Sequence, residues 1–512
     1  MSLATVRTRA QIGIEAPQVT CEVQVTGGLP RLTIVGLVET AVKESRERVR
    51  AAIRQSGYAF PDGLITVNLA PADLPKGSGR FDLAIAIGIL AASGQVPGDE
   101  LAGLELYGEL SFTGALRSVT GLLPALTRAR EDGARCIVPD ACRAEAGLLH
   151  GAETRLAGHL IGVVDHLSGA AALPLCPPVE WSSGDDTGTA RDLADLSGQS
   201  AARRALEIAA AGGHHLLMIG PPGTGKTMLA QCLPGLLPPM TDDQVIELLV
   251  LRSLTTARPE PVQRRRPFRS PHHTASSVAL VGGGRPLRPG EISLAHHGVL
   301  FLDELPEFAR PVLEALREPL ECGTIGVARA EQTAVFPARF QLVAAMNPCP
   351  CGFAGDPGKP CRCTPGQALR YRQRISGPFL DRLDIRIELD RAGLSLERLI
   401  GGSERPATES APQSPVNETS AAVRVRVGRA IERQLARSGR LNARLGSAAN
   451  LDACRPDRAG RALLEKAAAR FGLSARACDR CLRVARTIAD LAESDTVCEP
   501  HVAEALALRK EQ

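Results

Sequence analysis

Short apolar runs alternate with helical patterns along the first part of the chain. TCEVQVTGG, RLTIVGL and LITVNLA have the length and composition of β-strands, whereas TAVKESRERVRAAIRQSG and FDLAIAIGILAASG have helical spacing. This alternation predicts a mixed α/β domain over residues 1–175.

The pattern changes twice further along the chain. Residues 188–398 show strand, loop and helix in the order of a nucleotide-binding sheet, and segments after residue 420, such as RALLEKAAARFG, have helical spacing without strand signals. Two stretches lack apolar periodicity: CPPVEWSSGDDTGTARD from Cys176, and GGSERPATESAPQSPVNETS from Gly401. We therefore expect an α/β core over 188–398, a flexible linker over 401–419 and an all-helical piece over 420–512.

Composition narrows the class of protein. The chain has 512 residues, which is too long for one compact core, and its hydrophobic (44%) and charged (23%) fractions are ordinary for a globular protein. It has no apolar run long enough for a membrane helix, and MSLATVRTRA lacks the apolar centre of a signal peptide. Fourteen cysteines in such a chain favour the cytoplasm, where thiols stay free or bind metal.

Charge limits the ways in which the chain could contact nucleic acid. The net charge is only +4, but AAVRVRVGRAIERQLARSGRLNARLG, from Ala421, is rich in arginine and could be either a nucleic-acid contact or a solvated helix face. Aromatic residues make up 3% of the chain, which argues against recognition by base stacking. Any nucleic-acid contact should therefore be with phosphates.

HHLLMIGPPGTGKTMLA, from His214 to Ala230, carries a phosphate-binding loop between an apolar strand and a helix. Its backbone N–H groups and the positive end of the helix should face the phosphates. Lys226 should neutralise the β- and γ-phosphates, and the Thr227 hydroxyl should bind Mg²⁺. The predicted ATP-binding residues are Gly220, Pro221, Pro222, Gly223, Thr224, Gly225, Lys226 and Thr227.

Two further strands end in polar residues that suit the same site. GVLFLDE, from Gly298, ends in Asp303, which can hold Mg²⁺, and Glu304, which can polarise the attacking water as general base. FQLVAAMN ends at Asn347, which could orient the same water or be an ordinary strand end. Following the phosphate-binding loop, these residues predict ATP hydrolysis.

Several motifs together resemble one known family. GPPGTGKTMLA, RPFRSPHHTASS, GEISLAHHGVLFLDELPEF, AAMNPCPCG and SGPFLDRLDI resemble the magnesium-chelatase-like AAA+ family, in particular its YifB/ComM branch. The resemblance implies an AAA+ core with a helical lid, assembled into hexameric rings whose ATP sites lie between subunits. Arg382 then matches the arginine finger, with Arg374 as a nearby alternative, and Arg476 matches a lid arginine that senses the γ-phosphate.

The resemblance also implies a use for the ATP. EPLECGTIGVARAEQTAVFPARF resembles a hairpin that projects into the ring pore, with Arg329 near its tip, and GGGRPLRPGE, with Arg285 and Arg288, resembles a second pore insertion. These arginines should contact DNA phosphates, unless they are simply exposed loop residues. The implied function is a DNA helicase that acts on single-stranded or branched DNA. It would promote branch migration when incoming single strands recombine with the chromosome during natural transformation. The alternatives are the motor subunit of a magnesium-chelatase-like metal-insertion complex and an ATP-dependent protease.

The protease alternative comes from a resemblance of residues 1–175 to the Lon-type protease fold, notably in NLAPADLPKGSGRFDLAIAIGILAASG. Counting from Pro75, the serine position of that fold falls on Arg80, with Ser78 two residues early, and the lysine position falls on about Leu123. Leucine cannot take a proton from a hydroxyl, so we expect this domain to be catalytically inactive.

MNPCPCGFAGDPGKPCRC places Cys349, Cys351, Cys361 and Cys363 within one loop, 349–363. Four thiolates can close a tetrahedral zinc site, although a one-residue gap within each pair is tighter than usual. The four residues are therefore either structural zinc ligands or free thiols. The pairs His272–His273 and His296–His297 have no cysteine or carboxylate at ligand spacing, and we assign them no chemistry.

Overall fold

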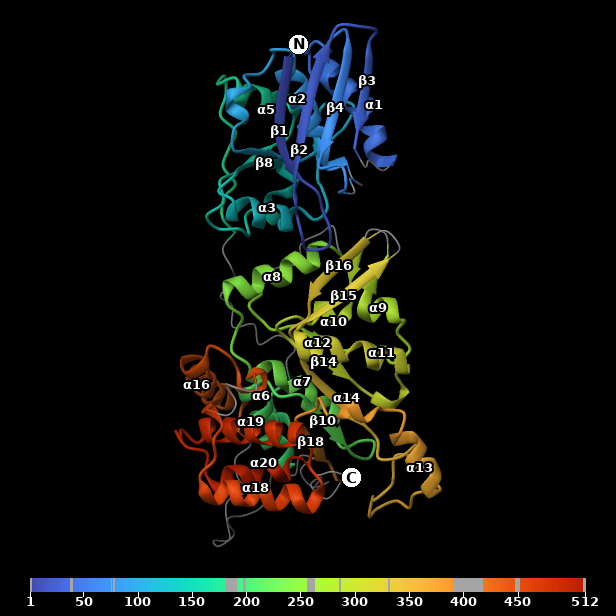
Figure 1. Ribbon diagram of the computed structural model, residues 1–512, viewed down its shortest axis with the longest axis vertical. Coiled ribbons are helices and arrows are strands. Elements are labelled where there is room, and N and C mark those ends of the chain that lie inside the picture. The colour runs from blue at the N-terminus through green and yellow to red at the C-terminus, as the bar shows by residue number, and fades with distance from the viewer. Residues whose placement is uncertain are drawn as a thin grey trace, which may run out of the picture.

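The computed structural model describes residues 2–36, 40–74, 76, 79–179, 191–196, 199–255, 263–284, 287–329, 332–390, 418–446 and 452–509. The molecule is elongated, with three regions stacked along its long axis (Figure 1). An α/β region containing the N-terminus lies at one end, a second α/β region lies in the middle, and a helical region lies at the other end.

The N-terminal region is a mixed seven-stranded sheet in the order β3-β4-β2-β1-β5-β8-β9. The pairs β1–β2 and β2–β4 are antiparallel, whereas the other neighbours run parallel. The predicted mixed α/β fold is thus confirmed here. The strands are β1 (Ser2–Arg9), β2 (Gln18–Thr26), β3 (Arg31–Val35), β4 (Leu64–Ala70), β5 (Leu104–Leu106), β8 (Arg135–Pro139) and β9 (Thr154–Ala157), and the main helices are α1 (Thr40–Gln55), α2 (Asp82–Ala92), α3 (Leu122–Glu131) and α5 (Leu160–Leu167).

The middle region is built on a five-stranded sheet in the order β11-β14-β17-β10-β18, in which every neighbouring pair is parallel. Strands β10, β14 and β17 are buried along their whole length, which explains why each is a continuous apolar run. Because the strands are parallel, the loops that follow them meet at one edge of the sheet. The strands are β10 (Leu216–Ile219), β11 (Phe268–Arg269), β14 (Val299–Leu302), β17 (Gln341–Met346) and β18 (Ile385–Glu388).

A long hairpin of β15 (Thr324–Arg329) and β16 (Gln332–Pro337) rises from the middle region toward the N-terminal sheet (Figure 1). It contacts the turn between β1 and β2, because a Cβ atom built on Gly13 would lie 2.9 Å from the Cβ of Ala334. Helix α8 (Asp242–Ser253) lies between the two regions, and its Val245 and Leu249 share an apolar cluster with Leu122 and Leu126 of α3. The two α/β regions are therefore joined by packed side chains.

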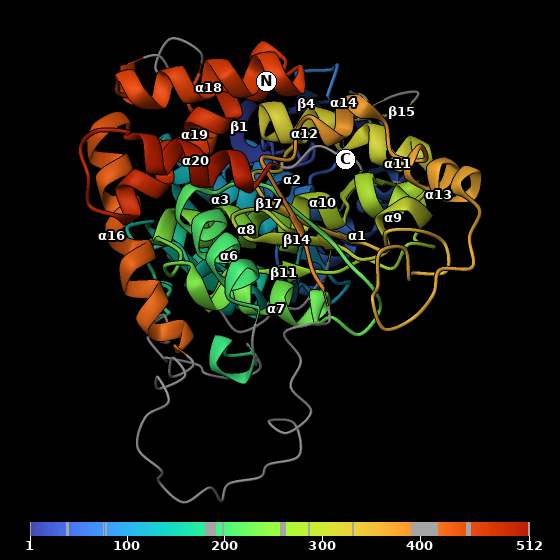
Figure 2. The same cartoon turned by 90° about the horizontal axis from the view of Figure 1, so that it is seen from below.

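The C-terminal residues 418–446 and 452–509 form helices and contribute no strand to a sheet. Helices α16 and α19 pack on α6 (Ser200–Gly212) and share its core cluster. Seen from below, the C-terminal helices gather on the side opposite α9 (Ser277–Val281), α11 (Arg310–Ala315) and α13 (Pro365–Arg372) (Figure 2). They are α16 (Ser420–Ser438), α18 (Arg458–Phe471), α19 (Ala475–Leu491) and α20 (Glu499–Ala507).

The arginine-rich segment from Ala421 is helix α16, and most of its arginines bond within the protein. Arg426 pairs with Glu207 and Glu418, and Arg437 pairs with Asp490. Further ion pairs join Arg429 to Glu493 and Arg433 to Asp495, and Arg424 donates to the carbonyl of Gly235. Arg426 and Arg437 therefore have an intramolecular role, whereas the ion pairs of Arg429 and Arg433 lie at the surface, where such pairs add little stability.

The linker predicted over 401–419 lies outside the described residues apart from Glu418 and Thr419. Among the described helices, none combines the length and the apolar character that a membrane-spanning segment requires.

Candidate nucleotide-binding site

The loop between β10 and α7 (Lys226–Leu236) has the backbone of a phosphate-binding turn. Gly223 and Gly225 have φ angles of +84° and +81°, a left-handed conformation that only glycine adopts without strain. Gly220 also needs to be glycine, because a Cβ there would lie 2.6 Å from the carbonyl oxygen of Leu389. Gln199, the residue before α6, supports the loop by donating to the carbonyl of Thr224 at 2.7 Å, a contribution that the sequence did not indicate.

Lys226 lies in the first turn of α7 with its ammonium group turned back over the loop. Its Nζ donates to the carbonyls of Gly220 (2.6 Å) and Pro221 (2.9 Å) and lies 3.3 Å from Oδ1 of Asn347. Burial lowers the pKa of Lys226, while the carboxylates of Asp303 and Glu304 act in the opposite direction. A mostly buried cation held by neutral carbonyls is well suited to exchange them for phosphate oxygens.

The end of β14 brings the two predicted carboxylates to the same place. The Thr227 hydroxyl donates to Oδ2 of Asp303 at 2.8 Å, so the two oxygen ligands predicted for Mg²⁺ are adjacent. The other carboxylate oxygen of Asp303 accepts the backbone N–H of Glu304 at 2.9 Å. Glu304 has φ +52°, an uncommon conformation for a residue other than glycine, and its side chain is half exposed at the edge of the sheet.

His273 contacts the predicted general base. Its Nδ1 lies 3.2 Å from Oε2 of Glu304, and its ring lies beside that of His272 with centroids 4.2 Å apart. The histidine follows β11, the strand next to β14, so the sheet topology creates this contact. The sequence analysis assigned no chemistry to this histidine because its partner is 31 positions away along the chain.

The three arginines expected to act on a γ-phosphate, two as alternatives for the arginine finger and one as the lid sensor, have different environments. Arg382 is buried, donates to the carbonyl of Pro378 at 2.5 Å and pairs with Glu321. Arg374 has a side chain that is 54% exposed and pairs with Glu307 at 2.8 Å. Arg476 is exposed in the first turn of α19. An arginine finger must reach a site on another subunit, and Arg374 is more accessible for that purpose than Arg382.

The predicted DNA contacts are only partly described. Arg329 is the last residue of β15, next to the hairpin tip, but its side chain lies outside the described part of the structure. Arg288 is exposed in β13 (Arg288–Pro289), which pairs with β12 (Gly282–Gly283), whereas Arg285 lies outside the described residues. Their contact with DNA remains a prediction.

The Lon-like positions come together without forming a Ser–Lys pair. Arg80 is fully buried, and its guanidinium donates to the carbonyls of Thr120 and Gly121, directly before the helix that contains Leu123. Arg80 and Leu123 therefore offer neither a hydroxyl nucleophile nor an amine base at this place. Ser78 lies outside the described residues.

The second histidine pair acquires a carboxylate partner through the fold. Nε2 of His296 and Nε2 of His297 lie 2.9 Å and 2.7 Å from Oε2 of Glu247, which α8 supplies. Nδ1 of His296 accepts the backbone N–H of Arg339 at 2.9 Å. Its Nε2 must therefore carry the proton and donate to Glu247, which leaves no lone pair there for a metal. The group is a hydrogen-bonded cluster linking α8 to the two histidines that precede Gly298 and β14.

This cluster makes stability depend on pH. Burial lowers the pKa of His296 to about 4, although Glu247 opposes the shift. Between pH 6.5 and 4 the unfolded chain binds a proton at His296 that the folded chain excludes, so this residue alone should lower the free energy of unfolding by about 2 kcal/mol between pH 7 and pH 5. Chemical denaturation at the two pH values should show a smaller loss for His296→Gln. Burial likewise lowers the pKa of His215 to about 4, so a residual slope should remain. An unchanged slope in His296→Gln would contradict this assignment.

The four cysteines of the loop 349–363 also meet in space, with every pair of sulfur atoms within 4.8 Å. Asp303 and Asn347, which follow β14 and β17, thus lie beside the phosphate-binding turn that follows β10.

Comparison with known proteins agrees with these features along the whole chain. The family model described as "Magnesium chelatase, subunit ChlI" matches residues 192–395, "Subunit ChlI of Mg-chelatase" matches 21–142, and "Magnesium chelatase, subunit ChlI C-terminal" matches 417–509. The chain is 49% identical to uncharacterized protein YifB of Escherichia coli, covering 99% of this chain and 97% of the relative. It is 48% identical to competence protein ComM of Haemophilus influenzae, covering 99% of this chain and 98% of the relative. The chain therefore belongs to the magnesium-chelatase-like YifB/ComM family of AAA+ proteins.

Proposed function

We propose that this chain is an Mg²⁺-dependent ATPase that uses ATP to move DNA through a hexameric ring in the cytoplasm, as a helicase promoting branch migration in natural transformation. The observation that carries the ATPase part is the meeting of Lys226, Thr227, Asp303, Glu304 and Asn347 at one edge of the sheet. The competence assignment is supported by the name of the Haemophilus influenzae relative.

Each residue of this site has a separate task in the proposed reaction. Bound Mg²⁺ would neutralise charge on the phosphates, and Thr227 and Asp303 are the residues that would hold it. Lys226 would leave the carbonyls of its own loop to pair with the β- and γ-phosphates. Glu304 would take a proton from the attacking water, and Asn347 would orient that water.

The proposed ring completes the site with residues from a neighbouring subunit. Arg374 is our choice for the finger that pairs with the neighbour's γ-phosphate, because its side chain is 54% exposed whereas that of Arg382 is 10% exposed. Arg476 is proposed as the sensor from the helical lid formed by α16 to α20.

DNA should stimulate ATP hydrolysis if the hairpin of β15 and β16 contacts the phosphate backbone. Coupling between two linked sites is typically 1–3 kcal/mol, so we expect a rate increase of about 5- to 150-fold with single-stranded or forked DNA. The stimulation should weaken with salt because phosphate contacts release counterions. Phosphate release measured with and without DNA at two salt concentrations tests both points.

A matched set of arginine variants tests the position of the contact. Arg329→Ala and Arg288→Ala should each reduce the stimulation, whereas Arg461→Ala, which removes an exposed arginine of α18, should leave it intact. Equal turnover with and without DNA in the unaltered chain would count against a DNA motor.

A metal-insertion motor is the second candidate, because all three matching family models describe a magnesium chelatase subunit. Unwinding of a forked DNA by the purified chain alone would distinguish the two candidates in favour of the helicase. The protease alternative finds no support at Arg80 and Leu123 and is not proposed.

A further inference from the structure

We propose that Cys349, Cys351, Cys361 and Cys363 hold one zinc ion, and that this metal-clamped loop supports the phosphate-binding loop against which it packs. The second part rests on the proposed ATP site. It assigns to the metal a role in nucleotide affinity that the spacing of the cysteines does not indicate.

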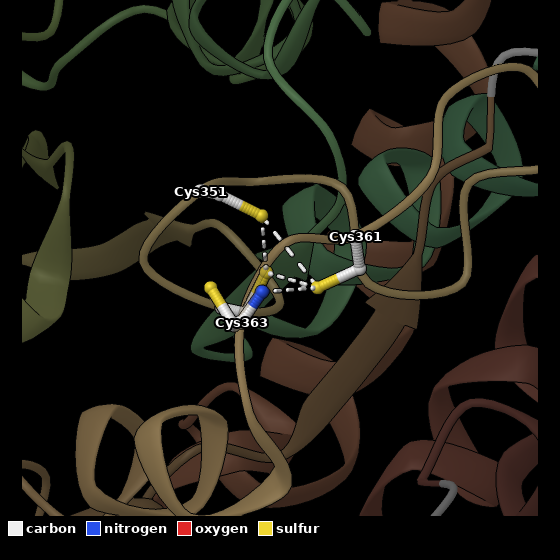
Figure 3. Close-up of side chains that lie close together, drawn as sticks. Cys351, Cys361 and Cys363 are labelled. Carbon is white, nitrogen blue, oxygen red and sulfur yellow. Dashed lines mark hydrogen bonds between the residues drawn. The ribbon is translucent and has the colours of Figure 1, made fainter.

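The sulfur atoms have the separation of ligands around a single ion. Sγ of Cys349 lies 3.4 Å from that of Cys351 and 3.6 Å from that of Cys361, and the Cys351–Cys361 distance is also 3.6 Å. A tetrahedral ion with Zn–S bonds of about 2.3 Å has ligand–ligand edges of about 3.8 Å. A disulfide would require about 2.05 Å. Figure 3 shows the sulfur atoms of Cys351 and Cys361 pointing into the space between the two arms of the loop.

Backbone N–H groups point at two of these sulfur atoms. The N–H of Ala354 donates to Sγ of Cys349 at 3.3 Å, and the N–H of Cys363 donates to Sγ of Cys361 at 3.4 Å (Figure 3 draws the second). Such bonds stabilise the deprotonated sulfur that binds metal. Tetrahedral sulfur ligands select zinc or iron–sulfur centres, and these close spacings favour one ion.

The outer arm of the loop, residues 357–361, lies at the surface. Residues 357–361 are exposed, and the contact of Lys359 with the ring of Phe353 is at the surface. Cys349, by contrast, is fully buried beside the core. A metal joining the four cysteines would therefore fix the outer arm of the loop to its buried base.

The first part of the loop, at Gly352, packs against the phosphate-binding turn. Gly352 has φ +85°, and a Cβ built on it would lie 2.8 Å from Cδ of Pro222 and 3.8 Å from Cγ of Asn347. Asn347, which contacts Lys226, is two residues before the first cysteine. On the other side, Arg372 donates to the carbonyl of Pro348 at 3.3 Å, two residues before Arg374. The loop that the metal would hold thus packs against the turn that would bind the phosphates.

Metal content tests the first part of the proposal. The full chain, purified without chelator, should contain one zinc per chain by elemental mass spectrometry, and Cys361→Ser and Cys363→Ser should lose it. Cys322→Ser, which alters an exposed cysteine outside the cluster, should keep it. Absence of zinc from the unaltered chain would overturn the proposal, and iron with visible absorption would replace it with an iron–sulfur site.

Two glycines of the loop test the second part. Gly352→Ala and Gly355→Ala both place a side chain at positive φ, but only the former meets Pro222, since nothing lies within 4 Å of a Cβ at position 355. Gly352→Ala should retain zinc and bind a fluorescent ATP analogue about tenfold more weakly or worse, whereas Gly355→Ala should bind it normally. Cys361→Ser should resemble Gly352→Ala in affinity. Normal affinity in Gly352→Ala and Cys361→Ser would overturn the coupling, while absence of ATP binding by the zinc-loaded, unaltered chain would refute the proposed ATP site.

Discussion

Glu304→Gln should reduce ATP turnover by about 10²- to 10⁴-fold and leave ATP binding intact. Glutamine has the shape of glutamate but cannot take a proton from the attacking water. The variant keeps the contacts that would bind the nucleotide, because Lys226 bonds to the loop, and Thr227 to Asp303, without using the Glu304 side chain. Phosphate release and binding of a fluorescent ATP analogue measure the two properties separately.

The control for this variant is Glu318→Gln, which removes an exposed carboxylate from α12 (Arg317–Cys322) in the same region. It should hydrolyse ATP at the normal rate. Turnover near normal in Glu304→Gln would mean that the base is another group, and loss of ATP binding would mean that the substitution damaged the site as a whole.

Arg374→Ala should reduce turnover by about 10³- to 10⁵-fold, the range expected when an arginine finger is removed. The reason is geometric: Arg374 presents a half-exposed guanidinium at the surface, where it contacts Glu307, the carbonyl of Pro306 and the ring of Tyr371. Because the finger acts on a neighbour, mixing Arg374→Ala with Lys226→Ala should restore part of the activity, each chain supplying what the other lacks.

Arg382→Ala provides the contrast. Its guanidinium is 10% exposed and bonded to Glu321 and to the carbonyl of Pro378. Its removal should mainly lower the melting temperature, because the variant loses the packing of a buried side chain together with its bonds to Glu321 and Pro378. If Arg382→Ala instead lost turnover at an unchanged melting temperature while Arg374→Ala stayed active, the finger would be Arg382.

The sequence predicted the central sheet well because its buried parallel strands are continuous apolar runs. Strands β10, β14 and β17 appear where those runs are, and the glycines of the phosphate-binding turn have the backbone angles that their spacing implied. The two-residue strand β11 has no comparable signal, although it determines where His273 lies.

What the sequence did not reveal depends on contacts between distant positions. Glu247 meets His296 and His297 from a helix about 50 positions earlier, and Gln199 reaches the phosphate-binding turn from 25 positions away. The arginines of α16 look like a free basic face until their acidic partners are located in space. The sequence shows which charged residues are present, but only the fold shows which of them form ion pairs.

The apolar contacts of α8 and of the β1–β2 turn affect how the chain can be divided. Cutting it near residue 188 would leave Val245 and Leu249 facing water, together with the part of the hairpin that Gly13 covers. An isolated ATPase fragment would consequently expose an apolar patch and tend to aggregate. A boundary placed at the change of composition near residue 188 would therefore uncover apolar side chains that the N-terminal region shields in the intact chain.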